Sequence, residues 1–370
     1  MTLPHVIAAA GVNEAFARGV QHLCSEGTEN QSRNGPVLVA PGPVITVTQN
    51  PMQRVLFSPL RDANPFFHLF ESLWMLAGRN DLPWLAQFNR QMGSYSDDGG
   101  QTQPAAYGYR WRKHFRYDQL EAIISHLIDQ PNSRRAVLTM WDAWPMNTDE
   151  NGTWIHGDVE KAFSNGKDVP CNTNCFFQIR DREFLDMSVQ CRSNDAVWGA
   201  HGANAVHFSV LLEYMAARLD LVPGVMYQYS FNYHLYPDNL KVDPTEMVRN
   251  ADTANAYRTG AKVTPLFCSE TVGGIWEREL AWFIELAKPR LRIPGSEWRE
   301  VQPPIFTEPF FCGIALPMLR AWRMHKEKNY PGALREVGAM GANSDWRIAA
   351  ELWLGKRALS HERKVANGDA

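Results

Sequence analysis

The chain has 370 residues, 45% of them hydrophobic and 21% charged, which is enough for one large domain or two ordinary ones. A net charge of −3 argues against a broad DNA- or RNA-binding surface, and no stretch is apolar over the length that spans a bilayer. Six cysteines without a second pair at zinc-site spacing predict reduced thiols and no metal site, and an N-terminus without signal-peptide features predicts a cytoplasmic location.

The first part of the chain mixes strand-like and helix-like segments. Residues 36–48 are rich in valine, proline and glycine, which is typical of a pair of strands with a tight connection. Residues 66–77 predict a buried helix that carries one acidic side chain, Glu71. Residues 118–129 have apolar positions at helical spacing, and Asp118 is placed to cap the start of this helix.

The middle of the chain carries the clearest periodic segments. Residues 136–142 predict a buried strand, and 176–191 predict two strands joined by a charged turn. Residues 205–219 have the pattern of an amphipathic helix, and the alternating aromatic residues of 225–236 indicate another strand.

Beyond Pro237 the chain alternates between turn-rich stretches and helical ones such as 275–287 and 345–354. We therefore expect an α/β domain over residues 1–245 and a mainly helical C-terminal extension over residues 246–370, whose role the sequence leaves open.

One group of residues combines a nucleophile with cations. Cys171 lies in PCNTN at the start of a strand, where a thiolate stabilised by nearby positive charge can attack an electrophilic carbon. Arg192 precedes the hydroxyl of Ser193, a combination that suits phosphate because the guanidinium makes paired, charge-assisted bonds. Together with Arg33 and the adjacent pair Arg134–Arg135, these arginines suit a phosphomonoester better than a carboxylate. Each of these residues also has an ordinary interpretation.

Taken singly, Cys171 can be a buried structural thiol, Arg134–Arg135 a solvated pair after a turn, and Glu71 a paired acid of the core. The histidines at positions 68, 201 and 207 are interpreted as structural or surface residues.

Six motifs occur together in the order seen in thymidylate synthases, so that the chain resembles this family from about Arg33 to about Tyr236. The motifs are Glu71 before Leu73-Trp74, Tyr107-Gly108-x-x-Trp111-Arg112, Ser133-Arg134-Arg135, Pro170-Cys171, Arg192-Ser193-x-Asp195 and His234-Leu235-Tyr236. The resemblance implies an α/β fold with a mixed sheet and packed helices, in a homodimer.

The resemblance also implies a reaction. Cys171 would add to C6 of a pyrimidine nucleoside monophosphate and make C5 nucleophilic toward 5,10-methylenetetrahydrofolate. Glu71 and Tyr107 would organise water and proton transfer at C5, and Asp195 would bind the pterin.

Nucleotide binding is implied for a larger set. The phosphate would be held by Arg33, Arg192 and Ser193 with Arg134 and Arg135 of the other subunit, the base by Asn204, and the sugar hydroxyl by His234 and Tyr236.

Several departures distinguish the chain from a methylating synthase. Asn172 follows the nucleophile where the family usually has histidine, Met92 stands near the place of a tryptophan, and the segment from Gly199 to Asn204 is one residue longer than usual. The pattern is similar to the pyrimidine nucleotide hydroxymethylases of bacteriophages, in which water rather than hydride quenches the one-carbon unit. We expect a uridylate substrate because the Asn204 amide offers a donor and an acceptor to uracil.

Three alternatives remain open. They are a thymidylate synthase that methylates dUMP, a dCMP or CMP hydroxymethylase, and a non-catalytic nucleotide-binding protein. A hydroxymethylase would work in the cytoplasm of a bacterium or of a phage-infected host cell.

Overall fold

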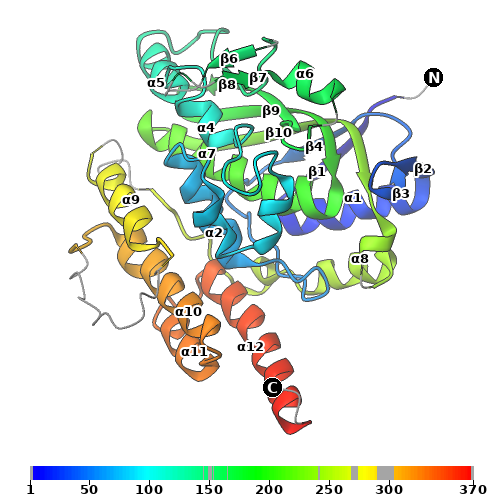
Figure 1. Ribbon diagram of the computed structural model, residues 1–370, viewed down its shortest axis with the longest axis vertical. Coiled ribbons are helices and arrows are strands. Elements are labelled where there is room, and N and C mark those ends of the chain that lie inside the picture. Colours follow the sequence, from blue (N-terminus) through cyan, green and yellow to red (C-terminus); the bar gives the residue numbers. More distant parts are fainter. Residues whose placement is uncertain are drawn as a thin grey trace.

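Among the residues that the computed structural model describes, an eight-stranded mixed sheet forms the centre of the fold (Figure 1). The described residues are 3–144, 146–148, 152, 154–164, 166–240, 242–267, 274–289 and 304–367. The strands are β1 His5–Ala9, β2 Thr28–Ser32, β3 Gly35–Val39, β4 Val44–Thr48, β5 Val137–Thr139, β8 Asn172–Arg180, β9 Phe184–Asp195 and β10 Val222–Leu235. A separate hairpin consists of β6 Met146–Thr148 and β7 Trp154–His156.

The sheet follows the order β1-β4-β10-β9-β8-β5, with β3 beside one end of β10 and β2 paired to β3. The pairs β1–β4 and β9–β10 are parallel and the other neighbours are antiparallel, which confirms the expected α/β fold with a mixed sheet. The expected hairpin is β8–β9. Its turn holds Asp181 and Arg182 at φ 56° and 57°, the left-handed pair that a tight hairpin turn requires.

The helices are α1 Val12–Glu26, α2 Pro65–Leu76, α3 Leu82–Ala86, α4 Tyr107–Arg112, α5 Gln119–Asp129, α6 Asp158–Phe163, α7 Asn204–Arg218, α8 Pro244–Thr253, α9 Ile275–Leu286, α10 Leu316–Lys326, α11 Tyr330–Gly338 and α12 Asp345–Ala366. The expected helices over 66–77 and 118–129 are confirmed as α2 and α5. Asp118 caps α5 by accepting hydrogen bonds from the backbone N–H groups of Leu120 and Glu121.

Three expectations from local pattern need correction. The helix expected over 205–219 is not amphipathic, because α7 packs between β9, β10 and α2 and is buried from Asn204 to Ala216. The strand expected over 136–142 is limited to β5. Residues 36–48 do form two strands, β3 and β4, but these strands do not pair with each other.

Instead, β3 and β4 both run antiparallel to β10, at successive places along it. Pro41 and Pro43 occupy the connection, and proline has no N–H to donate to a sheet ladder. The chain therefore continues along β10 rather than turning back on itself.

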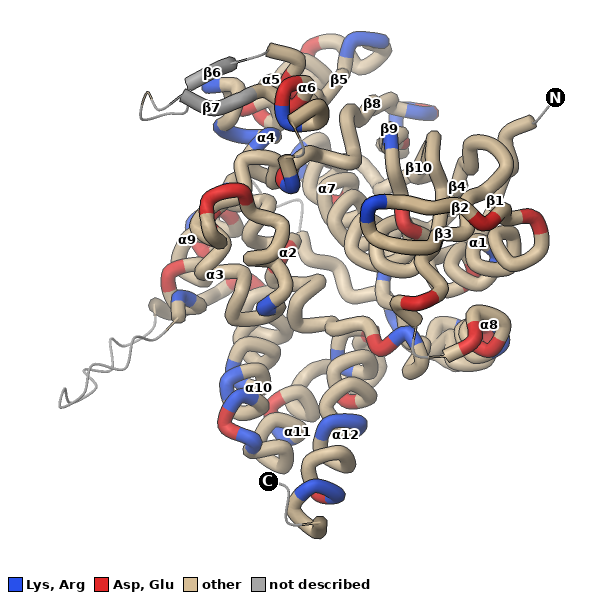
Figure 2. Tube along the Cα trace, turned by 45° about the vertical axis from the view of Figure 1, so that its right-hand side comes forward, with Lys and Arg blue, Asp and Glu red and all other residues tan. Residues whose placement is uncertain are grey.

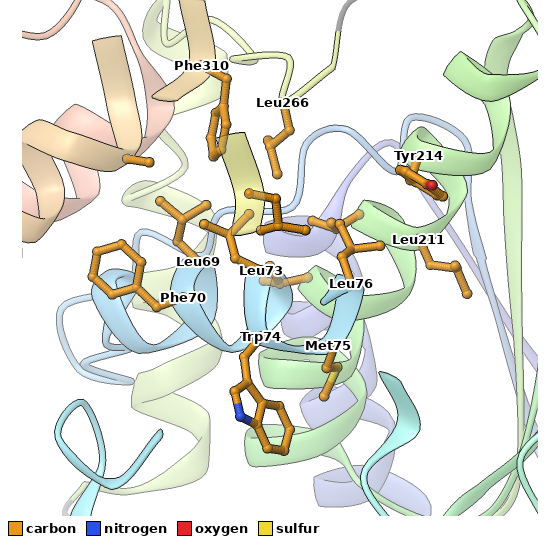
Figure 3. Packing of buried hydrophobic residues seen from close by; sticks show 14 of the residues in the cluster. Leu69, Phe70, Leu73, Trp74, Met75, Leu76, Leu211, Tyr214, Leu266 and Phe310 are labelled. Atoms are coloured by element: carbon orange, nitrogen blue, oxygen red, sulfur yellow. The ribbon is translucent and has the colours of Figure 1, made fainter. Parts of the chain in front are cut away.

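A hydrophobic core connects the sheet side of the molecule with the C-terminal helices. Figure 3 shows Leu69, Phe70 and Leu73 of α2 facing Leu266 and Phe310, which come from the C-terminal part of the chain. In Figure 1, α2 lies between α7 and the group α9–α12. The boundary near residue 245 stays a prediction. Within the described residues, no helix is long and apolar enough to cross a membrane.

Candidate active site

The candidate nucleophile lies where β8 begins beside the end of β9. Cys171 is half-buried directly before β8, and its carbonyl oxygen accepts a hydrogen bond of 2.9 Å from the backbone N–H of Arg192 on β9. The Arg192 guanidinium also donates to the carbonyl oxygens of Pro170, at 2.9 Å, and Val169, at 3.2 Å. Its Nη2 lies 3.8 Å from Cys171 Sγ. Arg192, which the sequence predicts to bind a phosphate, thus also faces the Cys171 thiol.

Opposing effects set the reactivity of this thiol. Burial raises the pKa of Cys171 above its ordinary value, whereas the positive charges of Arg192 and Arg33 lower it. Arg33 is exposed in the turn between β2 and β3, so the structure brings this turn within electrostatic reach of Cys171. The thiolate therefore depends on the two arginines.

Tyr107 is held against the residue that follows the nucleophile. The backbone N–H and the Nδ2 of Asn172 donate to Tyr107 Oη at 3.3 Å and 2.8 Å. Burial raises the pKa of the Tyr107 hydroxyl, so it stays protonated and retains its own proton for donation. Gly108 allows this placement, because a Cβ there would lie 2.0 Å from the carbonyl oxygen of Met75 in α2.

Glu71 faces a histidine that sequence reasoning interpreted as structural. His207 Nε2 lies 2.9 Å from Glu71 Oε2, and both side chains are buried between α2 and α7. His207 lies three residues after Asn204 on α7, so the two side chains share one helix face. This spacing is the sequence signal that places His207 on the side of the site. The ring of the next residue, Phe208, packs against Tyr107 at 5.6 Å. Glu71 thus faces His207 at close range, although Glu71 Oε2 and His207 Nε2 are not aligned as a hydrogen bond.

The segment before Asn204, which we expect to be one residue longer than is usual in the family, adopts a different helix type. Residues Ala196–Ala203 form the π-helix η2, with non-helical angles at Gly202, and a π-turn is how a helix absorbs one additional residue. Asn204 Nδ2 donates to Asn194 Oδ1 at 3.2 Å, and Asn194 in turn donates to Ser230 Oγ at 2.9 Å. Asn204 is therefore linked to β9 and β10.

Asp195 and His234 lie opposite each other in the parallel register of β9 and β10. Burial raises the pKa of Asp195 although its Oδ1 caps η2 by accepting from the N–H groups of Val197 and Trp198, both at 2.7 Å. Burial likewise lowers the pKa of His234, and the Asp195 charge opposes that shift. The His234 and Tyr236 rings lie 5.3 Å apart.

Two sets of residues remain to be placed. Ser193 is half-buried on β9 next to Arg192, and the Tyr236 hydroxyl lies 3.5 Å from Ser32 Oγ, beside Arg33. Arg134 and Arg135 are exposed before β5, and neither guanidinium has an ion-pair or hydrogen-bond partner among the residues described here. Contacts within one chain therefore connect Cys171 with Arg192, and the neighbouring Asn172 with Tyr107, whereas Arg134 and Arg135 have no such connection among the described residues. Nor does any cluster of three metal-ligating side chains occur in the described part of the chain.

A sequence profile of the thymidylate synthase family matches residues 14–264. The chain belongs to the thymidylate synthase family. The resemblance over Arg33–Tyr236 is thereby confirmed, and with it the classification as a one-carbon transferase.

Individual relatives extend the comparison beyond the family domain. A protein of Pseudomonas phage M6 named deoxyuridylate hydroxymethyltransferase is 40% identical over 98% of this chain and 97% of its own length. A protein of the same name from Bacillus phage SP01 is 36% identical over 61% of this chain and 57% of its own. A putative thymidylate synthase of Methanothermobacter marburgensis is 23% identical over 67% of this chain and its own full length. The similarity to the M6 protein therefore includes the C-terminal region that lies outside the family profile.

Proposed function

We propose that this member of the thymidylate synthase family hydroxymethylates C5 of dUMP with a one-carbon unit from 5,10-methylenetetrahydrofolate. The observation that carries the proposal is the half-buried Cys171 thiol with Arg192 Nη2 3.8 Å away, since addition to C6 needs a thiolate next to the bound nucleotide. The near full-length similarity to the phage M6 deoxyuridylate hydroxymethyltransferase supports hydroxymethylation over methylation.

The proposed steps use the geometry described above. Cys171 adds to C6, which turns C5 into an enolate-like nucleophile that takes up the one-carbon unit. The C5 proton then leaves to water near Glu71, whose carboxylate lies 2.9 Å from His207 Nε2, and the Tyr107 hydroxyl, which burial keeps protonated, donates a hydrogen bond to that water. Loss of the proton breaks the bond between the one-carbon unit and tetrahydrofolate, which departs and leaves an exocyclic methylene on C5. Water adds to the resulting exocyclic methylene and Cys171 is expelled, which gives the 5-hydroxymethyl product.

For the nucleotide, we assign the roles that the family resemblance implied. The phosphate is bound by Arg33, Arg192 and Ser193 with Arg134 and Arg135 from a second subunit, the base by Asn204, and the sugar hydroxyl by His234 and Tyr236. The hydrogen bond between Asn204 and Asn194 supports the base assignment, because it orients the Asn204 amide from behind.

The residues at the start of η2 fit a reduced folate. Asp195 supplies a carboxylate to N–H groups of a pterin, and Trp198, which is 47% exposed, offers an aromatic face that is fixed from one side by Arg61 at 3.9 Å. When bound, the folate supplies carbon at the oxidation level of formaldehyde. The chain's own contribution there is to position this ligand.

A homodimer is supported by an apolar face of the sheet. Val137, Phe176 and Tyr227 belong to one row of paired residues across β5, β8, β9 and β10, and they are 42%, 42% and 39% exposed. Burial of this face against a second copy would remove it from water and bring the unpartnered Arg134 and Arg135, which directly precede β5, to the partner's edge. We place the enzyme in the cytoplasm of a bacterium or of an infected host cell.

Product analysis tests the reaction. The purified protein should convert dUMP and methylenetetrahydrofolate to a product heavier than dTMP by one oxygen atom, and Cys171→Ser should abolish turnover while nucleotide binding persists. A product with the mass of dTMP would identify a thymidylate synthase instead, and an active Cys171→Ser variant would contradict the mechanism.

Subunit complementation tests the shared site. An Arg135→Ala subunit mixed with a Cys171→Ser subunit should regain activity, because one site of each hybrid dimer has both an intact thiol and an intact arginine. If proven subunit exchange gives no rescue, the arginines act within their own chain.

A further inference from the structure

We propose that the C-terminal helix α12 braces the folate side of the active site through Arg357, Asp62 and Arg61. The identity of the ligand on that side rests on the proposed function, but the brace itself rests on contacts within the chain. Figures 1 and 2 show α12 among the C-terminal helices and away from the sheet, and it packs against α2, so its effect on the site must pass through intervening residues.

The first contact fixes η2, the π-helix between Asp195 and Asn204. The Arg61 guanidinium is buried, donates from Nε to the carbonyl oxygen of Val197 at 2.8 Å, and lies 3.9 Å from the centre of the Trp198 ring. A Cβ on Gly202 would be 3.1 Å from Arg61 Nη2. Arg61 therefore packs against η2 at three places and holds the turn whose cap is Asp195.

The second contact joins the neighbour of Arg61 to α12. Arg357 donates to both carboxylate oxygens of Asp62, at 2.9 Å and 3.2 Å, and stacks on Trp353 at 3.3 Å. Lys356 donates to the carbonyl oxygen of Pro59 at 3.0 Å. Asp62 has φ 53°, in the left-handed region that aspartate enters more readily than most residues with a side chain. The two α12 cations, Arg357 and Lys356, both lie within ion-pair distance of its carboxylate.

Two further hydrogen bonds tie the same loop to the C-terminal part of the chain. The backbone N–H of Val55 donates to Tyr257 Oη at 3.2 Å, and that hydroxyl donates to Asp345 Oδ2, at the start of α12, at 2.9 Å. Ser58 Oγ bonds to Asn250 Oδ1 at 2.7 Å. The loop over 55–62 is thus held by C-terminal residues along its length, and Arg61 transmits its position to η2.

This arrangement gives the C-terminal region a role in catalysis that differs from substrate contact. Arg357 is a positioning residue, because it acts on η2 only through Asp62 and Arg61. Loss of the ion pair between Arg357 and Asp62 should disturb the Asp195–Trp198 turn and leave the nucleotide contacts of Cys171 and Arg192 unchanged. The expected signature is a rise of the KM for methylenetetrahydrofolate without a comparable rise of the KM for dUMP.

Arg357→Met tests the brace, because methionine keeps an apolar stem against Trp353 and removes the ion pair. Arg347→Met is the matched control on the same helix, since within the described residues the Arg347 guanidinium bonds only to Glu351 and to the carbonyl oxygen of Met340, both in the C-terminal region. Backbone hydrogen–deuterium exchange over 196–203 should accelerate about fivefold or more in Arg357→Met and not in the control. The folate KM should rise about fivefold, with the dUMP KM changed less than twofold.

A combined variant keeps the test decisive if Lys356 partly substitutes for Arg357. Lys356→Met with Arg357→Met should accelerate exchange more than the single change, because Lys356 Nζ also lies 3.4 Å from Asp62 Oδ2. Adding Asp62→Asn to this combined variant should have little further effect, because both ion pairs of Asp62 are already removed. Unchanged exchange over 196–203 in the combined variant would overturn the brace, as would equal acceleration in α5 and α7, which reports a loss of global stability. A wild-type protein without hydroxymethylase activity would refute the proposed function, while the exchange result would still decide the brace.

Discussion

Replacing Arg192 by glutamine should raise the pKa of the Cys171 thiol and slow its reaction with an alkylating reagent. Burial already raises this pKa, and the charge of Arg192 is the larger of the two influences that lower it. Glutamine removes that charge and retains a side chain of similar length. Arg192→Lys is the matched control, because it keeps the charge but loses the planar fork.

The distance between the groups sets the size of the effect. Two unit charges about 4 Å apart interact by about 1 kcal/mol in water and about 4 kcal/mol at the effective dielectric constant near a protein surface. Arg192 is exposed and Cys171 half-buried, so an intermediate value of about 1–3 kcal/mol applies to the 3.8 Å contact. This range corresponds to a thiolate fraction at neutral pH that is about ten- to a hundredfold lower.

Iodoacetamide labelling across a pH series, read by mass spectrometry of the Cys171 peptide, measures the change. The exposed thiols of Cys24 and Cys312 serve as references within the same digest. Cys171 should be labelled at similar rates in wild type and Arg192→Lys. In Arg192→Gln it should be labelled more slowly at every pH below the midpoint of that variant's plot of labelling rate against pH. Equal midpoints for all three proteins would refute the assignment of Arg192 as the cation that supports the thiolate.

Three further changes probe neighbouring parts of the site. Burial raises the pKa of Asp168 from 3.8 to about 6, so the stability it contributes is complete below the lower value and lost as pH rises through the higher one. In urea denaturation, the free energy of unfolding of wild type should therefore fall by about 2–3 kcal/mol relative to that of Asp168→Asn between acidic and neutral pH. Parallel plots of unfolding free energy against pH for the two proteins would contradict this. Asn204→Asp should shift kcat/KM toward dCMP over dUMP by roughly ten- to a hundredfold, and an unchanged ratio would exclude Asn204 as the base reader. Gly199→Ala should raise the KM for dUMP roughly tenfold, because its Cβ would lie 2.9 Å from Asn194 Oδ1; an unaltered KM would show that this amide pair is not used.

Local sequence signals predicted the elements whose determinants are close in the chain. The cap of α5, the helical period of α2 and the turn of β8–β9 each depend on a few neighbouring residues, and all three are confirmed. The pairing of β3 and β4 with β10 depends on residues far along the chain, and the turn residues near 40–43 do not indicate that partner. The burial of α7 on all sides is likewise a property of its neighbours and not of its own period.

The same distinction applies to the site. Family motifs predicted residues that the structure brings together, such as Cys171 with Arg192. The contact between Glu71 and His207 escaped prediction because it arises where α2 packs on α7, and the three-residue spacing from Asn204 to His207 does not identify the partner on α2. Arg61 was missed for a similar reason, since its partners belong to η2 and its support comes from α12.

The arrangement of the arginines poses a charge problem that a second subunit can solve. Arg192 supports the Cys171 thiolate and is also assigned to a phosphate, which carries about −1.5 to −2 charges near neutral pH. If Arg33 and Arg192 alone balanced this dianion, binding the substrate would cancel the charge that keeps the thiol ionised. Two additional cations from a partner would neutralise the phosphate and leave the field at Cys171 positive. The exposed and unpartnered state of Arg134 and Arg135 within the described part of the chain is what such a donation requires. In the proposed dimer, nucleotide binding and thiolate formation are therefore compatible only when both subunits are present, which is why activity should depend on assembly.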